Sequence, residues 1–483
     1  MKNILIISCI IFFFSQNLLS QSAINVIQSE KLTQLIKNDT IFQKFAGNVI
    51  IEYSNFKIQS DTILIDEYKE LIQAWGNTHI VNDTLNCKSD SIDIKQKNNE
   101  ITFHDNCVIK TNNMLIRSPK IQYNYKKETI KYSDNGEVVT NQYTINSKIF
   151  THYIKSNNSE FSQNVMLKNN DYNIESNNIK YDGDILYFLG DTKITSDDLY
   201  INCKKGFLKE SESLVISEGL DLYVDSIIVR ANNLIRNLNN DENIFHQNVE
   251  VLIDSSTIIF GDKLVQMNNQ SKITENCYIK LLNEKDSTLI RGKEINLDEE
   301  KNLTINEDVI ILGKNIKGSC GDMCFTSNYQ IIDMYKNPVI WLEKTQITGK
   351  EIQLQTTDNN LDSIYIPSDA FIISPVDSLN CYNQIKGNLL KGNFENNEIK
   401  HVTISGNSEM HYFDNNKEKE SYLMLNQVQS STIQLFFKQK NMKKVIFLDE
   451  IDSKSFDLKK DQITDMMDRN IYLEGFYLHP EIN

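Results

Sequence analysis

Residues 56–66, FKIQSDTILID, contain the pattern that decides the fold. In this stretch Ile58, Ser60, Ile63 and Ile65 form a frame in which one small residue stands between apolar positions, and the frame returns in LNCKSDSIDIK, residues 85–95. The small position recurs about every 29 residues and is always Ser, Cys, Ala or Gly: Ser60, Ser89, Ser118, Ser147, Ser176, Cys203, Ala231, Gly261, Gly292, Gly321, Gly349 and Cys381. About twelve copies of such a repeat predict one stacked architecture that shares a continuous core.

A turn precedes each small position by about twelve residues, as Gly47-Asn48 and Gly76-Asn77 show. Gly, Asn and Asp accept a positive φ with little strain, so they mark tight turns. An apolar alternation follows each turn, for example Val49, Ile51 and Tyr53. This period of two predicts two or three short strands per unit, and no helical spacing is sustained through residues 24–405. We expect the small residue where neighbouring coils approach closely.

The two ends of the chain depart from this repeat. Lys2, the apolar run of residues 4–14 and the small Ser20 are typical of a secretory signal peptide. We therefore predict a signal peptide at residues 1–21, a β-repeat domain at 22–405 and a C-terminal extension at 406–483. Within the extension, residues 457–469 have the pattern of one short amphipathic helix. The final YLEGFYLHPEIN is aromatic, and residues 406–483 as a whole are interpreted as an extension of the stack that forms a cap or a docking element.

The charge and the cysteines exclude several classes of protein. A net charge of −15 at pH 7 speaks against nucleic-acid binding, which needs basic patches to replace counterions. Seven cysteines remain after Cys9 leaves with the signal peptide, and this odd, irregularly spaced set describes neither a disulfide framework nor a zinc site. We expect buried cysteines that act as small apolar residues.

Catalytic patterns are not found in the sequence. The seven histidines are scattered without metal-ligand spacing, and there is no GxSxG motif or phosphate-binding glycine loop. Cys320 and Cys324 flank the small position Gly321 and have no histidine nearby in sequence to activate them. Asp61, Asp90 and Asp262 recur at one repeat position but form no local carboxylate pair. The prediction is a protein that is not an enzyme and that uses no metal or cofactor.

A right-handed parallel β-helix is an alternative to a stack of antiparallel strands, because one coil of a β-helix is similar in length to one of these repeats. It would favour a secreted surface adhesin or a glycan-active enzyme. Antiparallel pairing with an apolar groove favours a lipid carrier, whereas a sealed core with a local acidic cleft favours the β-helix.

The repeat resembles that of the LptA/OstA family of lipopolysaccharide-transport proteins, and similar units run to about residue 390. The resemblance rests on a GNV turn, an alternating strand and the pattern I-x-[SA]-D-x-I-x-I-D, and it is closest in residues 45–77. The terminal LEGFYLHPEIN resembles long OstA-like members. The resemblance implies an antiparallel β-jellyroll, open along one side, that holds the acyl chains of lipid A and bridges the two membranes.

The same resemblance implies the partners and the binding residues. The partners would be lipopolysaccharide and either other transport proteins or further copies of the chain, joined end to end by strand addition. The protein would be in the periplasm, either soluble there or attached to the outer membrane. The residues expected to face the groove are Val49, Ile51, Ile58, Ile63, Ile65, Ile80, Ile92, Ile94, Val108, Ile116 and Ile121.

Overall fold

A computed structural model describes twelve stretches of the chain: residues 24–37, 40–197, 199–209, 212–224, 227–300, 302–326, 329–376, 381–395, 397–415, 422–438, 441–459 and 471–480. The predicted signal peptide lies outside these described residues. The chain divides into two compact units, residues 1–190 and 191–483. The boundary between the units falls inside strand β15, and the division that the sequence placed before residue 406 falls inside strand β37.

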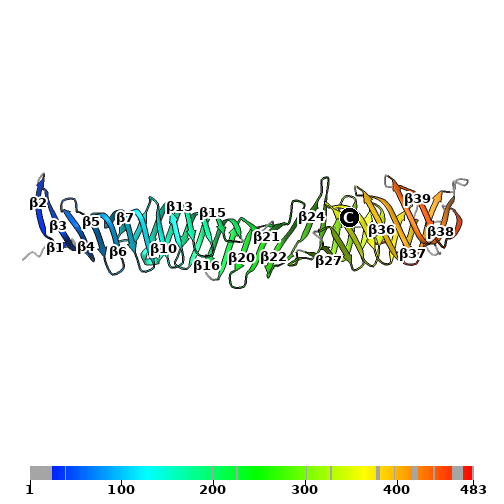
Figure 1. Cartoon of the computed structure of the whole chain (residues 1–483), viewed down its shortest axis with the longest axis horizontal. Helices are drawn as coiled ribbons and strands as arrows, with labels where there is room; N and C mark the ends of the chain where they lie inside the picture. Colours follow the sequence, from blue (N-terminus) through cyan, green and yellow to red (C-terminus); the bar gives the residue numbers. More distant parts are fainter. Residues whose placement is uncertain are drawn as a thin grey trace, which may run out of the picture. The chain divides into compact units, whose positions relative to one another are not determined.

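Unit 1 consists of strands and of two short 3-10 turns. The strands follow one another as successive rungs in Figure 1. The turns are η1 (Gln96–Asn98) and η2 (Ile154–Ser156). The strands are β1 (Ile24–Gln28), β2 (Lys31–Lys37), β3 (Thr40–Tyr53), β4 (Phe56–Asp66), β5 (Leu71–Val81), β6 (Asn86–Lys95), β7 (Glu100–Lys110), β8 (Met114–Asn124), β9 (Thr129–Tyr132), β10 (Gly136–Thr140), β11 (Thr144–Ser147), β12 (Ile149–Tyr153), β13 (Asn158–Lys168), β14 (Asn173–Tyr181) and β15 (Ile185–Thr195).

Unit 2 also consists of strands, which end with β40. Its strands are β16 (Tyr200–Lys209), β17 (Ser213–Glu218), β18 (Leu220–Val224), β19 (Ile227–Ala231), β20 (Asn233–Asn237), β21 (Glu242–Leu252), β22 (Thr257–Met267), β23 (Gln270–Thr274), β24 (Tyr278–Leu282), β25 (Ser287–Arg291), β26 (Glu294–Leu297), β27 (Leu303–Leu312), β28 (Ile316–Thr326), β29 (Ile331–Tyr335), β30 (Val339–Leu342), β31 (Thr345–Thr348), β32 (Ile352–Thr357), β33 (Asn360–Ile366), β34 (Ala370–Pro375), β35 (Tyr382–Gly387), β36 (Leu389–Glu395), β37 (Glu398–Asn415), β38 (Tyr422–Lys438), β39 (Asn441–Leu448) and β40 (Asp452–Lys459).

Each long strand pairs with its neighbour in two halves that are separated by a bulge. Strand β4 pairs with β3 along residues 62–66 and again along 56–60, and the register shifts at Gly47 and Asn48 of β3. Both turn residues have a positive φ, of 84° and 41°. A bulge bends the strand and increases its twist. The predicted turns are thus the points at which each strand bends, and inward-facing side chains of both halves form the core, with Phe103, Phe150 and Phe325 among the most buried.

The small position lies beside this bend, and where it is glycine the next rung leaves no room for a side chain. A Cβ atom added to Gly261 would lie 2.5 Å from Cγ2 of Ile273, and one added to Gly387 would lie 2.5 Å from Cγ2 of Ile404. Where serine is present, its hydroxyl binds carbonyls that the bulge releases. Ser60 Oγ lies 2.9 Å from the carbonyl oxygen of Trp75 and 3.1 Å from that of Gly76.

The recurring aspartates connect the bends of successive rungs. The side-chain amide of Asn77 donates to Asp61 at 3.2 Å, and that of Asn276 donates to Asp262 at 2.6 Å. Asn106 donates to Asp90 in the same way. The repeated aspartate therefore has a structural partner in each of these units.

The predicted all-β antiparallel class is confirmed. All the strand pairs whose register the structure defines run antiparallel, from β1 with β3 to β38 with β40. This pairing excludes the parallel β-helix for the described part of the chain, because coils of a β-helix pair in parallel.

Three sequence predictions are corrected. The tenth small position is Cys320, not Gly321, because the buried Cys320 pairs with Val309 after the bulge, as Ser60 pairs with Val49. The twelfth small position is Gly387, not Cys381, because a longer connection separates β34 from β35; Cys381 packs with Phe413 outside the stack. The helix expected at 457–469 does not begin there, since residues 457–459 pair with β38 as the end of β40. Residues 460–469 lie outside the described residues.

Candidate functional site

Ten of the eleven residues that the sequence assigned to the groove lie together in the interior of unit 1. They come from β3 to β8, and each is at most 4% exposed. Strand pairing places Ile51 opposite Ile58, and Ile58 opposite Ile80. Ile63 and Ile121 are completely buried. This stripe is a packed core in the structure.

Val108 is the exception, because its side chain lies on the other face of β7. The inward positions are Cys107 and Ile109, both buried, whereas Val108 is half-buried and pairs with Arg117. The bulge consists of Asp105 and Asn106, so Cys107 and not Val108 takes the first inward position after it. A shift of one residue turns a side chain to the opposite face of a strand.

Tyrosines close the edge of unit 1, where the turns of its two sheet halves meet. Tyr53 ends β3 and Tyr125 follows β8, yet their hydroxyl oxygens lie 3.0 Å apart and their rings meet edge to face. Phe56 packs on Tyr125 at 5.8 Å between ring centroids. Further along, Tyr143 meets Tyr181 at 6.1 Å. These contacts separate the predicted stripe from solvent.

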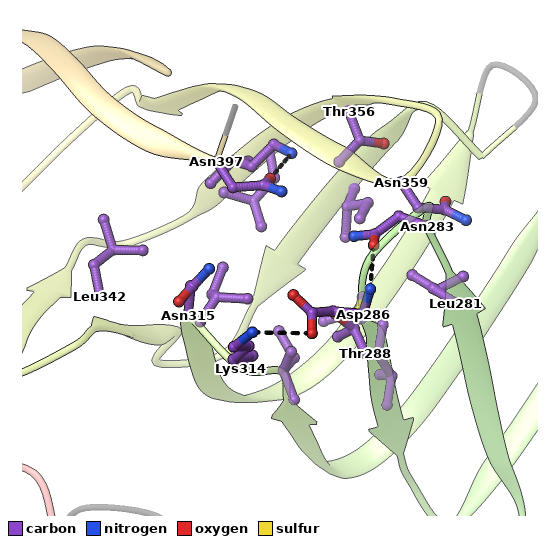
Figure 2. A pocket seen from close by; sticks show the side chains of 17 residues that line it. Leu281, Asn283, Asp286, Thr288, Lys314, Asn315, Leu342, Thr356, Asn359 and Asn397 are labelled. Carbon is purple, nitrogen blue, oxygen red and sulfur yellow. Dashed lines mark hydrogen bonds and ion pairs between the residues drawn. The ribbon is translucent and has the colours of Figure 1, made fainter. Parts of the chain in front are cut away.

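Unit 2 contains a cavity between the two halves of its bent strands. The larger hollow has a volume of about 410 Å³ and lies between β30, β31, β34 and β35 on one side and β36 to β39 on the other. A smaller hollow of about 90 Å³ adjoins it and shares Asn315, Leu342 and Asn397. Figure 2 shows the smaller hollow with these three residues around it.

The walls of the two hollows are mainly apolar, and the carboxylates of Glu343 and Glu398 also line the larger one. In the smaller hollow they include Met323, Ile332 and Leu354, each at most 5% exposed. The larger hollow is lined by Ile347, Ile372, Ile385, Val402, Met410 and Leu435, among others. Apolar walls with a few polar groups at the mouth are typical of sites for lipids and other apolar ligands.

The mouth is formed by turns that carry amide and charged side chains. Lys314 Nζ lies 3.3 Å from Asp286 Oδ1, as Figure 2 shows. Asn359 donates to the carbonyl oxygens of Leu282, at 2.9 Å, and Ser256, at 3.4 Å, which ties together turns from opposite halves of the sheet. Lys314 is the one lysine or arginine among the described residues that line the two hollows.

Short polar side chains stand along part of the larger hollow. Thr345, Ser374 and Asn383 line the larger hollow beside the turns, and Thr345 Oγ1 lies 2.9 Å from Ser374 Oγ. The corresponding strand ends in unit 1 carry tyrosines that meet across the edge. Replacing an aromatic pair with hydroxyl and amide side chains leaves the apolar interior accessible. The repeat pattern did not predict this cavity, and the change of residue type at the strand ends was a signal for it in the sequence.

The reactive side chains of the chain are engaged elsewhere. Burial raises the pKa of the Cys320 thiol to about 12 and also raises the pKa of Cys324, so both thiols stay protonated at neutral pH. Burial lowers the pKa of His152, whose Nδ1 lies 3.0 Å from Ser159 Oγ. In the described ranges no three histidine, cysteine or carboxylate side chains are grouped as metal ligands would be. The described residues that line the two hollows include no histidine and no cysteine.

Two family models match the chain. Residues 21–177 match the model described as OstA-like protein, and residues 228–360 match the model for the LptA and LptD N-terminal domain lipopolysaccharide-transport protein. Together the two matches cover more than half of the chain. The chain is an LptA/OstA-like protein. The first match lies in unit 1, and the second lies in unit 2 and includes most of the smaller hollow.

The LptA/OstA-like chain was also compared with individual proteins. LptH from Pseudomonas aeruginosa, an LptA-homologous periplasmic component of a lipopolysaccharide transport device, is 14% identical over 23% of this chain and 80% of its own. The TM-score is 0.21, which does not establish a common fold. No match was found among curated proteins. In the described part of the chain, no helix has the length and the apolarity needed to cross a bilayer.

Proposed function

We propose that this LptA/OstA-like protein binds lipopolysaccharide in the periplasm and shields its acyl chains during transport toward the outer membrane. The observation that carries the proposal is the apolar cavity of unit 2, with its mouth between two rows of turns. The protein acts as a carrier in this proposal and catalyses no reaction.

The size and lining of the cavity suit an acyl chain. A volume of about 410 Å³ lies within the range of roughly 300–1,000 Å³ that ligand sites occupy. Each buried CH₂ group contributes about 0.8 kcal/mol, so several methylene groups give useful affinity without charge attraction. This matters because the only lining cation in the described residues, Lys314, already pairs with Asp286.

The interior of unit 1 extends the proposal. The ten buried aliphatic residues of the predicted stripe would contact acyl chains if the edge between Tyr53 and Tyr125 opened. Opening exposes the stripe along β3 to β8. Val108 is excluded from this set because it lies on the outer face.

End-to-end assembly is supported by the terminal rungs. Strands β1 and β2 pair only with β3 in the described residues, and β39 and β40 pair only with β38. Such edges expose unpaired N–H and C=O groups that accept another strand. Ile36 is 75% exposed on β2, and Phe456 is 45% exposed on β40. The proposed partners at these edges are other lipopolysaccharide-transport proteins or a second copy of this chain.

Photocrosslinking in cells tests the function. A photoreactive amino acid at Leu342, which lines both hollows, should give a lipopolysaccharide adduct on an immunoblot. The matched control is Gln355, which is exposed beside the lining residue Leu354 on β32. An exported, folded protein without an adduct at Leu342 would overturn the proposal for unit 2. Equal adducts at both positions would mean that the lipid contacts the surface and not the cavity.

A further inference from the structure

Residues 471–480, called here the C-terminal segment, lie against the outer face of unit 2. The segment contacts residues of β31, β34, β35 and β37, which are far from it in sequence. Its residues Ile471 and Leu473 are 8% and 5% exposed. The segment therefore covers the outer faces of these strands.

Two buried glutamines hold the backbone of the segment. Gln384 donates to the carbonyl oxygen of Ile471 at 3.3 Å and accepts from the N–H of Leu473 at 2.8 Å. Gln346 makes the same pair of bonds with Tyr477 and His479, both at 2.8 Å. Each side-chain amide thus pairs with the C=O of one residue and the N–H two residues later, as a neighbouring strand would. The glutamines are 0% and 4% exposed, so their amides depend on these partners.

His411 adds a third polar contact. The surface formed by Gln346, Gln384 and His411 is called here the seat of the C-terminal segment. Its Nδ1 lies 2.7 Å from the carbonyl oxygen of Ile471. Because a carbonyl oxygen only accepts, the imidazole donates this hydrogen bond from Nδ1. The carbonyl of Ile471 is therefore held by both Gln384 and His411.

Apolar side chains fix which sequence can occupy the seat. Ile471 packs with Phe413 and Leu425, and Leu473 packs with Phe371 and Ile373. Between these side chains and the second glutamine the segment turns at Gly475, whose φ is +93° and where an added Cβ would lie 3.8 Å from the Phe371 ring. The turn is closed by a hydrogen bond from Phe476 N to Leu473 O at 3.0 Å. A side chain at Gly475 would strain this turn.

The strands under the segment also line the cavity with their opposite faces. Gln346 stands between Thr345 and Ile347, and both of these neighbours line the larger hollow. Gln384 stands in the same way between Asn383 and Ile385. Successive side chains of a strand point to opposite faces, so the seat and the cavity share one layer of backbone.

The strand register aligns the seat in one row across this layer. Gln346 pairs with Ile373, Ile373 with Gln384, and Gln384 with His411. A segment that binds members of this row therefore spans the spacing of four strands that line the cavity. A packed sheet transmits such a constraint because its interior has few voids to absorb a shift.

We propose that the C-terminal segment is an internal peptide ligand whose seating sets the affinity of the cavity for an acyl chain. This inference rests on the proposed lipid binding. The seated segment holds β31, β34, β35 and β37 at the spacing that keeps the cavity open. Coupling between two sites is reciprocal, so an acyl chain in the cavity also strengthens the seating of the segment.

The test uses the full chain, a fluorescent palmitate analogue as the probe and hydrogen exchange of the segment. The double variant Gln346→Leu/Gln384→Leu removes both backbone contacts while keeping side chains of similar size. We expect it to speed exchange at the Leu473 and His479 amides and to weaken probe binding about fivefold or more. In the unmodified chain, saturating probe should slow exchange at the same amides. The matched control is Gln353→Leu, because Gln353 of β32 donates to Asp333 of β29 at 2.8 Å and, among the described residues, has no hydrogen bond to the segment.

A second variant separates loss of seating from damage to the sheet. Gly475→Val changes only the segment, so the sheet keeps its own sequence, and it should reproduce both effects. If the unmodified chain binds the probe and both variants loosen the segment without weakening binding, the coupling is wrong and the lipid proposal stands. If the unmodified chain does not bind the probe, the lipid proposal fails and the coupling fails with it.

Discussion

The hydroxyl oxygens of Tyr53 and Tyr125 lie 3.0 Å apart, and this contact joins the two edges of unit 1 across 72 residues of sequence. The rings meet edge to face, and Phe56 packs against Tyr125. The apolar stripe beneath them is inaccessible while this contact holds. The edge of unit 2 has no equivalent tyrosine pair beside its cavity mouth in the described residues, where Thr345 and Ser374 stand instead. The two units thus present the same kind of interior in a closed and an open form.

Removing the tyrosine hydrogen bond should loosen the edge of unit 1. Tyr125→Phe keeps the ring contacts but removes the hydroxyl, so we expect a loss of about 1 kcal/mol in the free energy of opening. Hydrogen exchange of the Tyr53 and Phe56 amides measures this opening. Tyr68→Phe is the control, because the Tyr68 side chain is 81% exposed. Unchanged exchange in Tyr125→Phe would show that packing alone closes the edge.

The small position should not tolerate a methyl group. In Gly261→Ala the new Cβ would meet Cγ2 of Ile273, and we expect a loss of about 1–3 kcal/mol in the free energy of unfolding, measured with urea. Ile273→Ala removes the obstructing group at its own cost. The double variant should therefore lose less than the sum of the single losses, since the two positions touch. Additive losses would contradict a steric reason for glycine at this position.

Most of the fold could be predicted because its signals are local. The alternation of apolar residues, the turn residues and the small position each act within one repeat, so a single repeat such as residues 45–77 contains them all. The wrong predictions lie where the alternation of inward and outward side chains, or the spacing of the repeat, shifts. A two-residue bulge before Cys107 moved Val108 outward, and the longer connection before β35 moved the small position from Cys381 to Gly387.

The cavity and the seat of the C-terminal segment could not be predicted in this way. The cavity depends on short side chains such as Thr345 and Asn383, which look like ordinary polar residues beside turns. The seat depends on Gln346 meeting Tyr477 and His479, which are more than 130 residues away in sequence. A buried glutamine on an outward position has no local signature, because only its distant partner makes it buried.

Alkaline pH should destabilise unit 1 through its buried tyrosines. Burial raises the pKa of Tyr132 to about 12, and Tyr132 is 2% exposed and hydrogen-bonds Ser147. The unfolded tyrosine has a pKa of about 10, so the unfolded state releases its proton first as the pH rises. The stability contributed by Tyr132 is thus fully present below pH ~10 and is lost as the pH rises toward ~12.

The variant Tyr132→Phe isolates this effect. It should reduce the pH dependence of urea unfolding between pH ~10 and ~12, by up to about 1.4 kcal/mol per pH unit. Ser147 is the partner that loses a hydrogen bond, so the variant should also be less stable at neutral pH. An unchanged pH dependence would assign the alkaline loss to other groups, such as Tyr123, whose pKa is also raised to about 12, chiefly by burial.

Filling the cavity should weaken lipid binding without unfolding the chain. Leu342→Trp places a large ring where the two hollows meet, and Leu342 is only half-buried, so the ring can occupy the mouth with little overpacking. Displacing two methylene groups of an acyl chain, at about 0.8 kcal/mol each, should weaken binding of the fluorescent palmitate analogue about tenfold. Fluorescence titration measures the loss, and urea unfolding checks that the fold is retained.

The control for this variant is Gln355→Trp, which adds the same ring at an exposed position beside the lining residue Leu354. It should leave binding unchanged, because the ring stays outside the cavity. If Leu342→Trp binds the probe as tightly as the unmodified chain, the acyl chain does not occupy unit 2. The interior beneath Tyr53 and Tyr125 would then be the remaining apolar site, and a photoreactive residue at Ile63 should give the adduct that Leu342 does not.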